Sequence, residues 1–259
     1  NVPHMMGPSS DQFYKKELLY FVSRLEEFSG RRLETAKLRE AVKLYNKRRA
    51  LLRELYELRK ENPPRISGTE ITKLLVAGMG IPATEHIELI SGLIDDVKKR
   101  PAAKADGLPR IFLWGNEIDD ITFIQLVEEC GAHVVMDDLC TGTRFFWEDV
   151  PETADPFDGL VQRYLCTHCP RTLKPQAGNR IEDLAGRFGY IKQFVNDWTS
   201  NGAIFYIVRY CDTCELEGPD LKEYLGSFKL PVLMIEDDYS TSTIGQLRTR
   251  IQAFLEMIM

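Results

Sequence analysis

The chain has 259 residues, of which 44% are hydrophobic and 28% charged, an ordinary balance for a globular protein. Its 39 acidic and 33 basic residues give a net charge of −6, which disfavours general nucleic-acid binding because such binding depends on neutralising phosphates. The sequence has no apolar run long enough to cross a bilayer and no secretory signal. The six cysteines therefore indicate cytoplasmic thiols, metal ligands or redox groups rather than a disulfide framework.

The first hundred residues are predicted to be entirely helical. Apolar residues recur at helical spacing in four stretches, at 11–29, 35–60, 67–76 and 83–99, and the segment Ser67 to Glu70 opens the third. The pair Pro63-Pro64 ends the second stretch, and the many charges on that helix are interpreted as a solvated face.

The composition changes at residues 101–109, and strands and helices alternate after them. Short, doubly buried strands are predicted at 110–115, 132–136, 203–210 and 231–235. Helices are predicted at 119–130, 155–165, 179–200, 219–228 and 243–257. This alternation predicts parallel strands joined by right-handed crossovers. We expect an α/β protein in which a helical region, residues 1–100, packs on one side of a four-stranded, doubly wound parallel sheet in a domain of residues 101–259.

Polar residues follow each predicted strand. They are Gly115 to Glu117, Asp137 to Gly142, Cys211 to Glu215, and Glu236 to Asp238. Ligands of open parallel sheets bind beyond the carboxyl ends of the strands, so Cys211 and then Cys140 are the cysteines best placed for chemistry. Cys130 is expected to be an inert packing residue at a helix end. The acidic residues can equally cap the helices that follow, and no catalytic residue is assigned.

Common enzyme motifs are absent: the chain has no dinucleotide fingerprint, phosphate loop, nucleophile elbow or HExxH sequence. Two Cys-x-x-Cys pairs are present, Cys166/Cys169 and Cys211/Cys214. Such pairs can bind zinc or contribute to an iron–sulfur cluster. A helix and a buried strand separate the pairs, which argues against a zinc finger, although a zinc- or thiol-based module remains an alternative.

Several segments together resemble one protein family. They include VPHMM near the start, LYNKRR, PRIFLWGNEID, VEECGAHVVMDDLCTGTRFF, and NGAIFYIVRYCDTCELEGPDLKEYL. These resemble the D-component family of 2-hydroxyacyl-CoA dehydratases, which also includes benzoyl-CoA reductase subunits.

The resemblance implies an oxygen-sensitive enzyme of anaerobic metabolism. It also implies that the protein is one of two paired homologous subunits, each with a [4Fe-4S] cluster. A separate ATP-dependent iron–sulfur activator is then expected to supply the electrons. Proteins of this family dehydrate an (R)-2-hydroxyacyl-CoA through a ketyl radical anion, or reduce an aromatic acyl-CoA.

The resemblance also carries over one residue. The family's cysteine ligand after the third strand corresponds to Cys211, and Cys214 is then expected to be its neighbour rather than a ligand. The family's other ligands precede the VPHMM region, so we expect the ligand set to be incomplete in this sequence, and the sequence to be a piece of a longer protein. The alternative hypothesis is a catalytically silent fragment or a structural partner subunit of such a complex.

Overall fold

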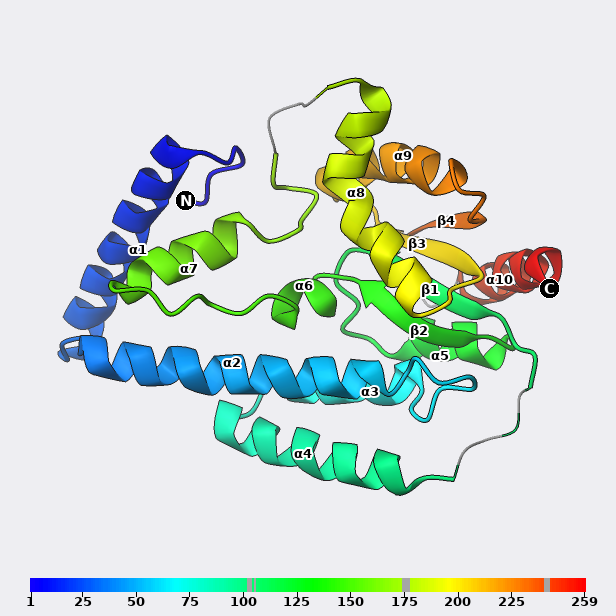
Figure 1. The fold of residues 1–259 in the computed structure, drawn as a ribbon, viewed down its shortest axis with the longest axis horizontal. Helices are drawn as coiled ribbons and strands as arrows, with labels where there is room; N and C mark the ends of the chain where they lie inside the picture. The colour runs from blue at the N-terminus through cyan, green and yellow to red at the C-terminus, as the bar shows by residue number, and fades with distance from the viewer. Residues whose placement is uncertain (102–103, 105, 174–177, 240–242) are drawn as a thin grey trace.

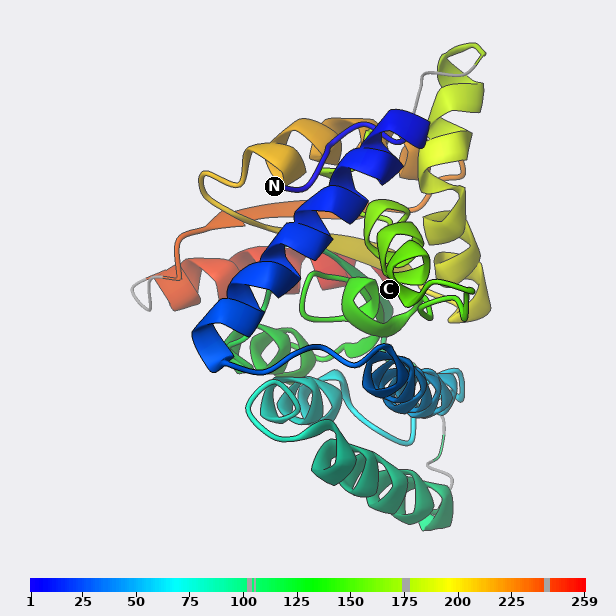
Figure 2. The same cartoon turned by 90° about the vertical axis from the view of Figure 1, so that its left-hand side faces the viewer.

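The computed structural model describes residues 1–101, 104, 106–173, 178–239 and 243–259. The first hundred residues form four helices: α1 (Pro8–Ser29), α2 (Thr35–Glu57), α3 (Gly68–Ala77) and α4 (Ala83–Lys99). Ser67 begins α3 with a reciprocal capping box to Glu70. Because α1 buries only Tyr14 and contacts α7 (Pro156–Leu165), it lies away from the sheet (Figures 1 and 2).

The remaining residues form a parallel sheet with helices between its strands. The strands are β1 (Arg110–Gly115), β2 (His133–Asp138), β3 (Gly202–Val208) and β4 (Val232–Asp237). Their order is β2-β1-β3-β4, and every neighbouring pair is parallel. The predicted α/β fold with a four-stranded parallel sheet is therefore confirmed.

Helices cover both faces of the sheet, as a doubly wound fold requires. Alternate strand residues point to opposite faces. Phe112 and Phe205 lie in a buried cluster with residues of α8 (Arg180–Asp197) and α9 (Asp212–Gly226). The intervening residues pack with α5 (Thr122–Glu129) and α10 (Ile244–Ile258) in a second cluster.

The helical region meets the sheet along its β2 edge, not across a whole face. There α3 contacts both β2 and α5, and a Cβ atom on Gly68 would lie 2.7 Å from Cβ of Val134. Glu128 of α5 accepts hydrogen bonds from the backbone N–H groups of Gly68 and Thr69, which suits a carboxylate at a helix N-terminus. The first buried cluster contains residues from both sides of the predicted boundary near residue 101.

The prediction that a helix starts at residue 219 was wrong. The helix α9 begins at Asp212, and Pro219 lies inside it. Proline is favoured in the first turn of a helix, which made Pro219 look like a start. The true start directly follows Cys211, so this cysteine occupies the N-cap position. A further short helix that was not predicted, α6 (Thr143–Phe146), follows β2.

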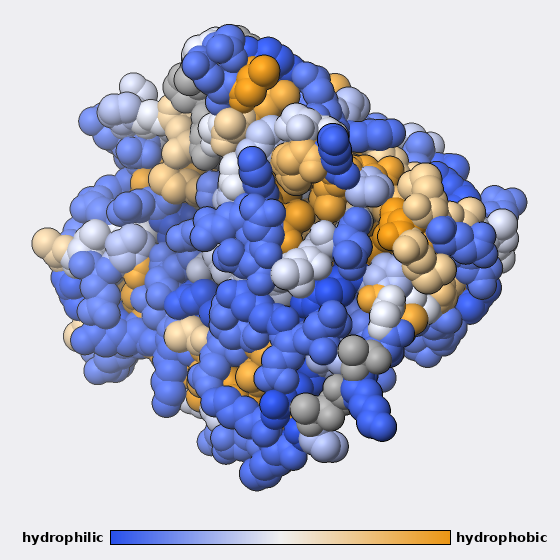
Figure 3. All heavy atoms as spheres, turned by 45° about the vertical axis from the view of Figure 1, so that its right-hand side comes forward, coloured by the Kyte–Doolittle hydropathy of each residue, from blue (hydrophilic) through white to orange (hydrophobic). Residues whose placement is uncertain are grey.

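No helix within the described residues is both long and apolar enough to span a membrane. Figure 3 shows a largely hydrophilic face, on which apolar residues are visible in separate patches. The edge strand β4 is only half-buried over its first three residues.

Candidate functional site

The turn after β1 joins the ends of the first three strands. Gly115 has φ of 154°, and a Cβ atom there would lie 1.8 Å from the carbonyl oxygen of Tyr206, so only glycine fits. Asn116 follows it and accepts a hydrogen bond from Val208 N–H through its side-chain oxygen at 2.8 Å. Its backbone oxygen accepts from Cys140 N–H at 3.2 Å. Asn116 thereby holds the loop after β2 beside the end of β3.

Cys211 lies on a tight turn between β3 and α9. Tyr210 adopts a left-handed backbone conformation, with φ of 69°, and Cys211 N–H donates to the carbonyl of Val208 at 3.1 Å. A left-handed non-glycine residue is costly and often marks a functional turn. This turn leaves Cys211 half-buried at the N-terminus of α9.

The surroundings of Cys211 favour its thiolate. Burial alone would raise the pKa of the Cys211 thiol, but hydrogen bonds from Thr213, from the Cys214 backbone and from Asn116 lower it below its ordinary value. The distance from Cys211 Sγ to Thr213 Oγ1 is 3.5 Å. Because the thiolate is the form that binds metal, Cys211 fits the role of one cluster ligand.

Cys140 is exposed and lies next to a buried cation. Arg144 binds the Asp138 carboxylate through Nε at 3.1 Å and Nη2 at 2.8 Å. Its Nη1 lies 2.7 Å from the Gly115 carbonyl oxygen and 3.6 Å from Cys140 Sγ. Protein atoms around the Cys140 sulfur displace water from it and so raise the pKa of this thiol, and Arg144 opposes that rise. The loop after β2 thus places a thiol and a permanent positive charge side by side.

The neighbouring Asp137 is buried and engaged in hydrogen bonds that hold the loop. It accepts hydrogen bonds from the Tyr56 hydroxyl at 2.5 Å and from the Thr143 N–H at 2.9 Å. Burial raises the pKa of its carboxyl. A Cβ atom on Gly142 would lie 1.9 Å from Asp137 Oδ1, so this glycine allows the loop to close over the carboxylate.

The other cysteines have different environments. Cys214 is buried, and burial raises the pKa of its thiol, in keeping with a neighbour of the site. Cys130 is half-buried against the α5 and α10 cluster, where burial also raises the pKa of its thiol.

The described residues contain no group of three or more histidine, cysteine or acidic side chains able to hold a metal ion. The pairs Cys166/Cys169 and Cys211/Cys214 lie among these residues, so they do not form the four-cysteine zinc site of the alternative interpretation. Cys211 fits as one thiolate ligand of a larger set, while the assignments of Cys211 and Cys140 to a cofactor stay predictions.

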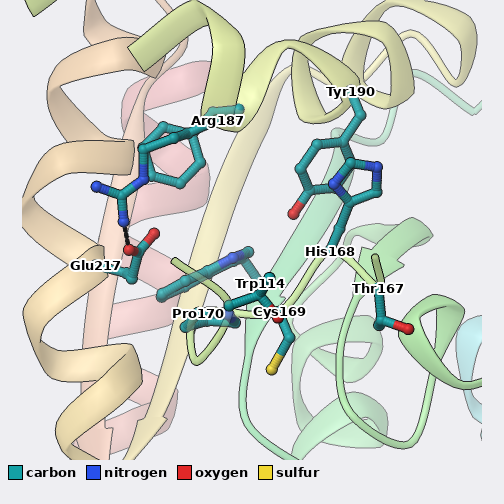
Figure 4. A pocket seen from close by; sticks show the side chains of 10 residues that line it. Trp114, Thr167, His168, Cys169, Pro170, Arg187, Tyr190 and Glu217 are labelled. Carbon is teal, nitrogen blue, oxygen red and sulfur yellow. Dashed lines mark ion pairs between the residues drawn. The ribbon is translucent and has the colours of Figure 1, made fainter. Parts of the chain in front are cut away.

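A pocket lies beside these strand ends (Figure 4). Ten residues from β1, the segment after α7, α8 and α9 line it: Trp114, Thr167, His168, Cys169, Pro170, Thr172, Arg187, Phe188, Tyr190 and Glu217. Tyr190 joins the pocket to the charged network, because its hydroxyl donates to Asp138 Oδ2 at 3.0 Å. An electrostatic interaction with Cys169, in the pocket wall, adds to the rise in the pKa of the Cys140 thiol.

Sequence reasoning missed Arg144 and Tyr190. Arg144 lies in the segment DDLCTGTRFF, in which the cysteine and the carboxylates, rather than the arginine, were taken as the residues placed for chemistry. An arginine six residues after a strand-end aspartate was the available signal. Tyr190 gave none, because an aromatic residue in an amphipathic helix usually indicates a core position.

The chain is similar to known proteins over almost its whole length. A family model described as 2-hydroxyglutaryl-CoA dehydratase, D-component, matches residues 1–258. The chain is 29% identical over 256 residues to a protein named as a dehydratase subunit, YjiM, of Escherichia coli (strain K12). It is 24% identical over 247 residues to the (R)-phenyllactyl-CoA dehydratase beta subunit of Clostridium sporogenes. It is 26% identical over 248 residues to a subunit of the benzoyl-CoA reductase of Thauera aromatica.

These alignments cover 96%, 95% and 95% of this chain, respectively, but 64%, 64% and 63% of the three relatives. The chain thus spans just under two thirds of the length of each of these proteins.

Proposed function

The chain belongs to the 2-hydroxyglutaryl-CoA dehydratase D-component family, and from this membership we propose that it is a subunit of an enzyme acting on a CoA thioester. The reaction is the dehydration of a 2-hydroxyacyl-CoA, or the related reduction of an acyl-CoA. The observation that carries the proposal is the match to this family over residues 1–258, and the position of Cys211, half-buried at the end of β3 and the start of α9, supports it. The names of the relatives, two of them dehydratase subunits and one a reductase subunit, support it.

The substrate's chemistry explains why one-electron reduction is needed. In a 2-hydroxyacyl thioester the hydrogen that must leave is on the β-carbon and is not acidic, so acid–base elimination is unfavourable. A thioester carbonyl that gains one electron becomes a ketyl radical anion, which can expel the neighbouring hydroxyl group. A [4Fe-4S] cluster would supply low-potential electrons when bound.

The residues of this chain have separate roles in the proposal. Cys211 would hold the cluster as one thiolate ligand, and Asn116 and Thr213 stabilise that thiolate by hydrogen bonds. Arg144 keeps a fixed positive charge beside Cys140, where it lowers the energy of nearby negative charge. Trp114 and Phe188 are buried in the pocket wall and supply part of its apolar lining.

The wider complex is also part of the proposal. We infer a homologous partner subunit, an ATP-dependent iron–sulfur activator as the electron donor, and a cytoplasmic, oxygen-free setting. The word "subunit" in the names of the relatives supports the partner.

Metal analysis of the complete complex tests this proposal. We would purify the wild type, Cys211→Ala and Cys130→Ala without oxygen, and measure iron, acid-labile sulfide and the electron paramagnetic resonance signal. The Cys211→Ala variant is expected to lose most of its iron and sulfide. The Cys130→Ala variant, which removes a thiol on the other face of the sheet, should keep both.

Unchanged iron in a folded Cys211→Ala complex would refute the assignment of this ligand. A wild-type complex with neither iron nor sulfide would instead favour the structural-subunit alternative. Zinc in place of iron would favour the thiol–metal module.

A further inference from the structure

The pocket beside the strand ends has the position of an acyl-binding site. Cys169 and Tyr190 lie in its wall. The Tyr190 hydroxyl donates to Asp138, the carboxylate that also binds Arg144 beside Cys140. The pocket therefore adjoins the proposed reaction centre.

Aromatic rings line part of the pocket, beside its polar groups. Trp114 and Phe188 are buried, and the rings of His168 and Tyr190 stack with their centroids 4.0 Å apart. Figure 4 shows the stacked pair on one side, Arg187 and Glu217 on the other, and Trp114 and Cys169 between them. Such surfaces favour apolar groups because burial removes apolar area from water.

The pocket's guanidinium group is already neutralised. Of the described residues that line the pocket, Arg187 is the one arginine or lysine. It forms an ion pair with Glu217, which is 7% exposed, and its Nη1 lies 3.8 Å from the Asp220 carboxylate. A second carboxylate entering the pocket would have to lose its water and compete with Glu217 for the same guanidinium, beside a like charge.

We propose that this pocket holds the acyl chain of the CoA thioester and selects an uncharged aliphatic or aryl acyl group over a dicarboxylic one, with Glu217 as the residue that determines this specificity. The inference rests on the proposed function and narrows its substrate class. Nothing in the family's name requires this result, since that name refers to a dicarboxylic acyl group, 2-hydroxyglutaryl.

The test compares two (R)-2-hydroxyacyl-CoA substrates in the complete, activated complex. One carries the neutral 4-methylpentanoyl chain and the other the anionic glutaryl chain. We expect the wild-type complex to favour the neutral substrate in kcat/KM by at least about tenfold. In Glu217→Gln the side chain keeps its size and loses its charge, which leaves Arg187 with its more distant carboxylate partner, Asp220. The preference should then fall about tenfold or more, through improved use of the glutaryl substrate.

Glu223→Gln is the matched control. Glu223 lies on the same helix, 57% exposed, and pairs with Arg180 outside the pocket. Its substitution should leave the preference unchanged. An unchanged preference in a folded Glu217→Gln complex, or a wild-type preference for the glutaryl substrate, would overturn the inference.

A binding measurement separates this inference from the proposed function. The unreactive analogues 4-methylpentanoyl-CoA and glutaryl-CoA would be titrated calorimetrically into the wild-type complex, a comparison that does not depend on the folding of any variant. Tighter binding of the neutral analogue supports the inference, and equal binding overturns it while leaving the CoA-thioester function standing. If neither analogue binds and no acyl-CoA is turned over, both this inference and the proposed function are refuted.

Discussion

Replacing Arg144 by methionine should destabilise the protein strongly, because it leaves a buried carboxylate without its cation. The side chains of Arg144 and Asp138 are only 4% and 2% exposed, and two hydrogen bonds at 2.8 and 3.1 Å join them. Burial would lower the pKa of Arg144, but the Asp138 carboxylate raises it above its ordinary value. Breaking such a pair from one side costs about 3–5 kcal/mol.

The variant Tyr190→Phe should destabilise the protein less than Arg144→Met does. It removes one hydrogen bond to Asp138, at 3.0 Å, while the guanidinium stays in place. The expected loss is about 1–2 kcal/mol, since a hydrogen bond to a charged group contributes about 1.5–3 kcal/mol and Arg144 still satisfies the carboxylate.

Thermal unfolding of the purified protein measures both effects. For a protein of this size, 1 kcal/mol corresponds to roughly 2–4 °C, so Arg144→Met should lower Tm by about 6–20 °C. Arg209→Met is the matched control: Arg209 pairs with the carboxylates of Glu236 and Asp238, but it is 50% exposed, and such exposed pairs contribute about 0–1 kcal/mol. A Tm for Arg144→Met within about 2 °C of that of Arg209→Met would refute the reasoning.

Two further predictions concern the turns at the strand ends. Because the pKa of the Cys211 thiol is lowered, its thiolate should persist to lower pH than that of an ordinary cysteine. Its alkylation by iodoacetamide, followed by peptide mass spectrometry, should therefore rise at lower pH than that of Cys130, whose pKa is raised; the reverse order would contradict the assignment. Gly115→Ala should lower the free energy of unfolding by about 2 kcal/mol or more, because the new Cβ atom would collide with the Tyr206 carbonyl oxygen. Gly92→Ala in α4, where a Cβ atom meets nothing within 4 Å, should raise it by up to about 1 kcal/mol. Equal urea midpoints for the two variants would contradict this prediction.

The fold could be predicted because its signals are local and repeated. The strand at 110–115 is buried at every position, and so is most of β3, which is the composition expected of a parallel sheet covered on both faces. The capping box at Ser67 and Glu70 marked the start of α3. The packing of the helical region against the β2 edge was not predictable, since the contact between Gly68 and Val134 joins residues 66 positions apart.

The candidate site was predictable only as a set of loops. Parallel topology placed the residues after each strand at one edge, but it did not reveal which of them are neutralised by buried partners. Asp137 and Asp138 are adjacent in sequence, yet β-strand alternation points them to different partners. Asp137 meets Tyr56 of α2, and Asp138 meets Arg144 and Tyr190. Tyr56 and Tyr190 come from helices distant in sequence, so only the tertiary structure brings them to these carboxylates.

The misplaced start of α9 shows how one local rule can hide a functional feature. Proline at position 219 carries no N–H, so a helix that contains it lacks one backbone hydrogen bond. The helix nevertheless continues through Pro219 and begins seven residues before it, at Asp212. The earlier start makes Cys211 the N-cap residue and brings Thr213, whose hydroxyl oxygen lies 3.5 Å from Cys211 Sγ, and Cys214 into the first turn of the helix. These two residues help to lower the pKa of the Cys211 thiol. The position of the helix start therefore distinguishes Cys211 from Cys140 and Cys214, whose thiols have a raised pKa.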